Sequence, residues 1–153
     1  MPSRARLLAA VGPLAAAVLG GLATDPGSQW FRSLRMPSWY PPPQTFGIVW
    51  TGLYTGTAWA AGEVLTRTDG DQQRAFGRAF AINMVLNAGW SALFFRVHRP
   101  WLATVECAAL TVSTADLVRR AAPVSRPAAV VLTPYATWAA FATVLSGAIA
   151  RRN

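Results

Sequence analysis

Long apolar runs, separated by short polar segments that contain arginine, make up most of the chain. Each run is close to the roughly 20 residues that a helix needs to cross a hydrocarbon core about 30 Å thick. The runs cover residues 7–23, 45–65, 76–95, 101–118 and 128–150. The polar turn at 66–73 contains Asp69-Gly70-Asp71 and indicates a short loop between antiparallel helices. This pattern predicts an all-α membrane protein in which residues 1–153 form a single five-transmembrane-helix bundle.

The segment from 28 to 43 breaks this pattern. Its three consecutive prolines, residues 41–43, forbid a regular helix. The segment also carries Arg32, Arg35 and the aromatic residues Trp30, Phe31, Trp39 and Tyr40. Side chains with an apolar body and a polar tip favour the boundary between lipid and water. We therefore expect a partly ordered, proline-stiffened lid outside the hydrocarbon.

Composition and charge support lipid as the surrounding solvent. The 153 residues are 53% apolar and 13% charged, whereas soluble domains carry about 25% charged residues. The net charge of +8 comes from arginine alone, placed at the ends of the apolar runs, where it anchors helices at lipid headgroups. A nucleic-acid-binding protein would gather its basic residues on one face, so no nucleic-acid partner is expected.

The two ends of the predicted helices give a weak signal for orientation. Eight arginines fall on the N-terminal side and six on the opposite side, a small bias toward an N-terminus inside. Residues 1–6 resemble the start of a signal peptide, but the later apolar runs favour an uncleaved first helix. The pattern does not identify which membrane holds the protein.

Residues for conventional catalysis are scarce. The sequence has one histidine, His98, in a loop between arginines, and one cysteine, Cys107, inside an apolar run. It has no Cys pair, no Ser-His-Asp set and no Gly-rich phosphate loop. We therefore expect no metal site and no cofactor, and acid–base or metal-dependent catalysis lacks its parts.

The second apolar run offers two different surfaces. Helical spacing puts an aromatic and polar set on one face: Trp50, Tyr54, Thr57 and Ala61. Small residues lie nearly opposite: Gly52, Gly56 and Ala60. The Gly-x-x-x-Gly spacing permits close helix approach, either inside the bundle or across a dimer.

The third and fifth runs add inward-facing stripes. Asn83, Asn87, Trp90 and Phe94 follow one another at helical spacing on the third run. Amides in hydrocarbon need polar partners, so this stripe predicts either interhelical hydrogen bonds or the wall of a ligand cavity. On the fifth run, Trp138, Ala142 and Leu145 form an inward face with Phe141 beside it, and Tyr135 lies one turn earlier. Single aromatic residues here could also anchor the helix at the membrane interface.

The fourth run carries two acidic residues, Glu106 and Asp116, which are too costly to face lipid while ionised. Asp116 lies near Arg119 and Arg120, so an ion pair at the helix end is expected. Three alternatives stay open for Glu106. It reaches toward water, pairs with an arginine, or stays protonated between helices.

Several motifs, in order along nearly the whole chain, resemble one family. They are Trp30-Phe31, Pro37-Ser38-Trp39-Tyr40-Pro41-Pro42, Val49-Trp50-Thr51-Gly52-Leu53-Tyr54, Leu86-Asn87-Ala88-Gly89-Trp90 with Phe94-Phe95, and Pro134-Tyr135-Ala136-Thr137-Trp138-Ala139-Ala140-Phe141-Ala142-Thr143. The sequence resembles a bacterial-type member of the translocator protein family, also called tryptophan-rich sensory proteins or peripheral-type benzodiazepine receptors. The resemblance implies a five-helix bundle, usually a homodimer, with a ligand cavity beneath the long first loop.

The resemblance also implies ligands and site residues. The ligands are protoporphyrin IX and related tetrapyrroles, sterols, and isoquinoline or benzodiazepine compounds. The protein that binds them is surrounded by membrane lipid. With the helical faces, it gives the candidate binding residues Trp39, Phe46, Trp50, Tyr54, Asn83, Asn87, Trp90, Phe94, Tyr135, Trp138, Phe141 and Ala142. Of these, Trp50 and Trp138 are the catalytic candidates if the protein degrades porphyrin.

Three positions depart from the family pattern, namely Met36 for a lysine, Phe31 for a tyrosine and Ala92 for a proline. The spacing proposed for cholesterol contact is absent, because Tyr135 is far from Arg151. The expected function is a membrane receptor or sensor for porphyrins, with Arg32 and Arg35 pairing with the propionates. The alternatives are light- or oxygen-dependent porphyrin degradation and transport of tetrapyrroles or sterols.

Overall fold

The computed structural model describes residues 4–153 as an all-helical chain, as the apolar runs predict. Within these residues the helices are α1 (Arg4–Ala23), α2 (Gln29–Ser33), α3 (Pro43–Thr66), α4 (Gly70–Phe95), α5 (Pro100–Ala121) and α6 (Arg126–Ala150). The five long helices have 20 to 26 residues, whereas α2 has only 5.

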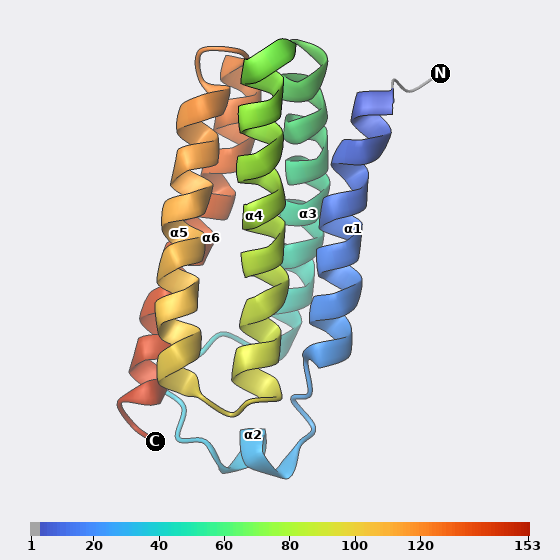
Figure 1. The fold of residues 1–153 in the computed structure, drawn as a ribbon. Helices are drawn as coiled ribbons and strands as arrows, with labels where there is room; N and C mark the ends of the chain where they lie inside the picture. The colour runs from blue at the N-terminus through green and yellow to red at the C-terminus, as the bar shows by residue number, and fades with distance from the viewer. Residues whose placement is uncertain (1–3) are drawn as a thin grey trace.

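The long helices lie side by side and alternate in direction (Figure 1). Helix α1 packs against α3 and α4, α5 packs against α4 and α6, and α3 packs against α6. The five helices therefore form a closed ring. The end of the ring near α2 and the C-terminus is called the lid end here, and the end where α1 begins is called the far end.

Three of the helices in the described chain, α1, α5 and α6, are long and apolar enough to cross a membrane, judged by length and composition. Helices α3 and α4 are just as long. Their glycine, threonine and amide residues lower their hydropathy, and three of these polar side chains, Thr57, Asn83 and Asn87, are buried inside the ring.

Three predicted boundaries differ from the observed ones by three residues or more: the starts of α1 and α4, and the end of α5, which is Ala121 and not residue 118. Helix α4 begins at Gly70, not at residue 76, so the expected turn at 66–73 shrinks to residues 67–69. Helix α1 begins by Arg4, not at residue 7. Hydropathy marks only the apolar part of a helix, while polar first turns extend beyond it. Asp71 suits the first turn of α4, where the backbone dipole favours a negative charge.

The lid segment expected at 28–43 differs from the prediction in two ways: it contains the short helix α2, and its last residue, Pro43, belongs to α3. Ser28 caps α2, accepting a hydrogen bond on its side-chain oxygen from the backbone N–H of Phe31. Pro42 precedes α3 and Pro43 opens it, a position where proline costs no backbone hydrogen bond. The prolines therefore end the lid and start the next helix.

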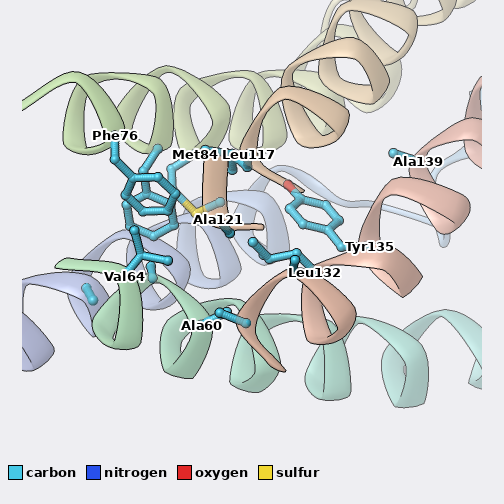
Figure 2. Packing of buried hydrophobic residues seen from close by; sticks show 14 of the residues in the cluster. Ala60, Val64, Phe76, Met84, Leu117, Ala121, Leu132, Tyr135 and Ala139 are labelled. Atoms are coloured by element: carbon cyan, nitrogen blue, oxygen red, sulfur yellow. The ribbon is translucent and has the colours of Figure 1, made fainter. Parts of the chain in front are cut away.

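Small residues let the helices approach closely in the far half of the ring. Ala60 and Ala61 of α3 and Ala9 of α1 are buried. A Cβ atom added at Gly56 would lie 3.0 Å from Cγ1 of Val131, so α3 and α6 touch at this glycine. Figure 2 shows the buried side chains of this core, with the ring of Tyr135 among them. Of the two uses of the Gly-x-x-x-Gly spacing, Gly56 serves the one inside the bundle.

Ion pairs lie near the far end. Asp116 is bound by Arg119 at 2.6 Å and by Arg120 at 2.5 Å, which confirms the expected ion pair. Glu63 of α3 pairs with Arg67 at 2.5 Å. These contacts hold charge at the helix ends, where arginine anchors a helix at the lipid headgroups.

Candidate ligand-binding site

An aromatic seam joins α3 and α6. It consists of Phe46, Trp50 and Tyr54 on α3 and Tyr135, Trp138 and Phe141 on α6. Because the two helices are antiparallel, Phe46 meets Trp138 with ring centroids 5.8 Å apart, and Trp50 meets Tyr135 at 6.1 Å. Both pairs have the edge-to-face geometry that aromatic rings prefer.

The lid covers the lid end of this seam. Trp39 contacts Phe141 at a centroid distance of 6.0 Å, and Tyr40 contacts Phe46 at 5.5 Å. Trp39 remains 44% exposed, while desolvation raises the pKa of the half-buried Tyr40. The lid therefore rests on the seam through aromatic contacts.

A directional chain of hydrogen bonds crosses the interior next to the seam. The Tyr54 hydroxyl donates to Oδ1 of Asn87 at 2.7 Å, and Nδ2 of Asn87 donates to the Tyr135 hydroxyl at 2.9 Å. The Tyr135 hydroxyl donates to Oδ1 of Asn83 at 2.9 Å. Nδ2 of Asn83 then donates to Oγ1 of Thr114 at 3.0 Å and to Oγ of Ser113 at 3.1 Å.

This polar chain ties four helices together. Tyr54 comes from α3, the two amides from α4, the threonine and serine from α5, and Tyr135 from α6. Asn83 and Asn87 are 0% and 5% exposed, so both amides find partners inside the ring and not in lipid. Interhelical hydrogen bonding, the first of the two interpretations of the amide stripe, is therefore confirmed.

The lid end of α4 carries a second aromatic group. Trp90 stacks on Phe94 at a centroid distance of 5.4 Å and donates its indole N–H to Oγ of Ser146 at 3.3 Å. Phe94 also meets Trp30 of the lid at 5.5 Å. Trp30 in turn stacks on His98 at 4.2 Å, so the only histidine has an aromatic partner at the bundle end.

The candidate residues fall into two neighbouring groups. The first group, made of the seam, the lid and the polar chain, includes all of them except Trp90, Phe94 and Ala142. Trp90 and Phe94 belong to the second aromatic group, on α4. Ala142 is half-buried beside Phe141 on α6. Sequence reasoning missed the hydrogen-bond partners Ser113, Thr114 and Ser146. Their periodicity on α5 and α6 places them inward, but isolated hydroxyl residues are too common for that signal to single them out.

The Glu106 carboxyl group differs from every other acid in the described residues. Both of its oxygens are buried without a hydrogen-bond partner. Oε1 lies 3.9 Å from where a Cβ of Gly89 would be, so the carboxyl group occupies the contact between α5 and α4. The neighbouring Cys107 thiol points elsewhere, toward the Ala139 carbonyl oxygen at 3.6 Å.

A groove of about 810 Å³ lies apart from the seam, between α1 and α4. The lid arginines Arg32 and Arg35 are exposed and form no ion pair within residues 4–153. The same part of the chain contains no group of three acidic, histidine or cysteine side chains that could hold a metal ion.

Comparison with known proteins identifies the architecture. The sequence profile of the TspO/MBR family matches residues 9–152, which contain the lid and almost all of the long helices. The chain belongs to the TspO/MBR family. The resemblance seen in its motifs is therefore confirmed, and the protein is a multi-pass integral membrane protein.

Relatives in the TspO/MBR family come from distant organisms. The chain is 35% identical over 129 residues to the tryptophan-rich protein TspO of Chlorobaculum tepidum, and this alignment covers 84% of this chain and 82% of that protein. It is 32% identical over 120 residues to the tryptophan-rich protein TspO of Bacillus cereus, covering 78% of each chain. It is also 30% identical over 129 residues to the human translocator protein, covering 83% of this chain and 76% of that one.

Proposed function

We propose that this protein is a membrane receptor or sensor that binds a planar tetrapyrrole such as protoporphyrin IX inside the helix ring, against the aromatic seam and beneath the lid. The observation that carries the proposal is the seam itself, which lines α3 and α6 with six aromatic side chains next to a polar interior. A flat apolar macrocycle with a few polar groups fits such surroundings.

Ring contacts supply the driving force for binding. The seam rings touch one another, so an entering macrocycle replaces ring–ring contacts with ring–macrocycle contacts. Each such stacked or edge contact contributes about 0.5 to 1.5 kcal/mol beyond burial. The exchange costs little because Trp138 and Trp50 are only partly buried and neither indole N–H forms a hydrogen bond within residues 4–153. Binding therefore requires the seam rings to turn aside, with little change in the helix backbone.

The lid supplies charge for the ligand's acidic groups. Arg32 and Arg35 lie in the segment that rests on the seam, and both are exposed. Their guanidinium groups suit charge-assisted hydrogen bonds to the two propionates of a porphyrin. Isoquinoline or benzodiazepine compounds, which are flat and aromatic, are proposed as further ligands of the seam.

The proposed setting in the membrane has two parts. We propose that all five long helices span the bilayer, with the inward-facing polar side chains Tyr54, Asn83 and Asn87 of α3 and α4 paired within the ring. The protein acts as a homodimer, and the exposed apolar faces of the ring are available for a second copy.

Absorption spectroscopy tests the function directly. Purified protein in detergent is titrated with protoporphyrin IX in the dark, and the titration is repeated in light. We expect shifted porphyrin bands that saturate with protein and keep their total intensity. Unchanged bands would reject binding. Loss of the bands with formation of a product would instead identify degradation, and ligand flux into sealed vesicles would identify transport.

Variants separate binding from degradation. Trp50→Phe and Trp138→Phe keep an aromatic ring while removing the indole and its easier oxidation. If the protein degrades porphyrin through these indoles, product formation falls much more than binding does. If it only binds, affinity changes modestly and the parent protein yields no product. Undiminished degradation in the folded double variant would reject a catalytic role for both residues.

A further inference from the structure

The groove between α1 and α4 faces outward along the membrane-spanning part of the ring. Its walls are mostly apolar, with Leu8, Ala15 and Leu19 on α1 and Phe80, Ala81 and Val85 on α4. Leu8 and Leu19 are 59% and 57% exposed, and Val85 is 72% exposed. In a membrane protein these surfaces contact lipid chains or another apolar segment.

Charge marks one end of the groove. Arg4 and Gln73 line it at the far end, and Arg78 follows the lining residue Gly77 on α4. Neither Arg4 nor Arg78 forms an ion pair with a residue in the described chain. The nearby acids are already engaged, since Asp71 pairs with Arg74 and Glu63 pairs with Arg67. The end of the groove therefore offers positive charge without a protein counter-ion.

The length and charge of the groove suit a lipid. The lining runs from Arg4 to Leu19 of α1, about 22 Å of helix length. An acyl chain lies along the apolar walls while an anionic headgroup meets the arginine at the far end. An apolar helix in the same place would leave this arginine without a counter-ion.

We propose that this groove is a binding site for an anionic phospholipid, with an acyl chain lying between α1 and α4 and the headgroup held by Arg4 at the far end. The site is separate from the aromatic seam and does not depend on the proposed tetrapyrrole binding. A basic side chain near an anionic headgroup contributes about fivefold in affinity. The apolar walls bind the chain of any phospholipid, while Arg4 selects the charge of the headgroup.

Native mass spectrometry of the full chain in mild detergent tests this site. The protein is titrated with phosphatidylglycerol and with phosphatidylcholine of the same acyl chains. We expect phosphatidylglycerol to bind about fivefold more tightly. Arg4→Gln abolishes this preference. Ala81→Phe fills the groove and weakens both lipids, as does Ala15→Phe from the other wall if the first variant fails to fold.

Matched controls use the same changes elsewhere. Arg126→Gln removes an exposed arginine at the far end of α6, and Ala109→Phe enlarges an exposed alanine on α5. Both should bind the lipids as the parent does. Equal affinity for the two lipids, or an undiminished preference in Arg4→Gln, would overturn the proposal. So would a dimer that Ala81→Phe dissociates without changing lipid binding, because the groove would then hold a second copy.

Discussion

The two ends of the helix ring are built differently. At the far end, small residues bring the backbones together, as Ala60 of α3 and Gly56 against Val131 show. At the lid end, large rings such as Trp90, Phe94 and Trp138 occupy the space between helices. The polar chain through Tyr135 lies between the two regions.

This difference indicates that the two ends have different roles. Close contact of α3 with α1 and α6 leaves these helices little freedom to reposition, because they rest directly on one another. Rings that touch other rings can turn while the backbone stays in place. The far end therefore holds the helices together, and the lid end carries the rings that could turn for the ligand proposed above.

The largest effect is expected from enlarging a residue at the far end. Gly56→Leu forces α3 away from Val131 and should lower the free energy of unfolding by about 1 to 3 kcal/mol. Gly52→Leu is the matched control, because a Cβ at Gly52 meets no atom within 4 Å. Thermal or denaturant unfolding in detergent measures both. Equal stability of the two variants would remove the distinction between the ends.

A smaller loss is expected from breaking the polar chain. Asn83→Leu leaves the Tyr135 hydroxyl without its acceptor and should cost about 1 to 2 kcal/mol of unfolding free energy. Tyr54→Phe removes only the outer bond of the chain and should cost about 0.6 kcal/mol. The same unfolding measurement ranks them. A larger loss for Tyr54→Phe would show that the chain does not centre on Tyr135.

Replacing Glu106 should raise the free energy of unfolding, whereas the substitutions above lower it. Its buried oxygens lack partners, so Glu106→Leu should raise the free energy of unfolding by about 1 kcal/mol. Glu63→Leu is the control, because it removes the partner of Arg67 and should bring no such increase. A clear loss of stability in Glu106→Leu would mean that the carboxyl group has a partner in the membrane.

The sequence predicts the helices better than their ends. Apolar runs locate each long helix. The first turns of α4 are polar, so the hydropathy pattern alone makes them look like a loop. The helical period alone puts Asn83 and Asn87 on one inward stripe. The period cannot say that Tyr135 receives a hydrogen bond from one amide and donates to the other, because this depends on how far α6 slides along α4.

Loop contacts escape sequence reasoning for a related reason. Trp30 and His98 stack, although they lie in different loops with no periodic relation. The groove beside Arg4 also has no signature, since its lining alternates between two helices that are distant in sequence. Contacts within one helix follow from spacing, whereas contacts between helices need the packed structure.

The most direct test compares two tryptophans in a protoporphyrin IX titration, followed by absorbance in the dark. Trp138 lies in the seam. Trp59 lies on α3, nearer the far end of the bundle, and is 49% exposed. Trp138→Ala should weaken binding about tenfold, which corresponds to about 1.4 kcal/mol of lost ring contact. Trp59→Ala should bind as the parent protein does. Unchanged affinity in a folded Trp138→Ala variant, or an equal loss in Trp59→Ala, would contradict recognition at the aromatic seam.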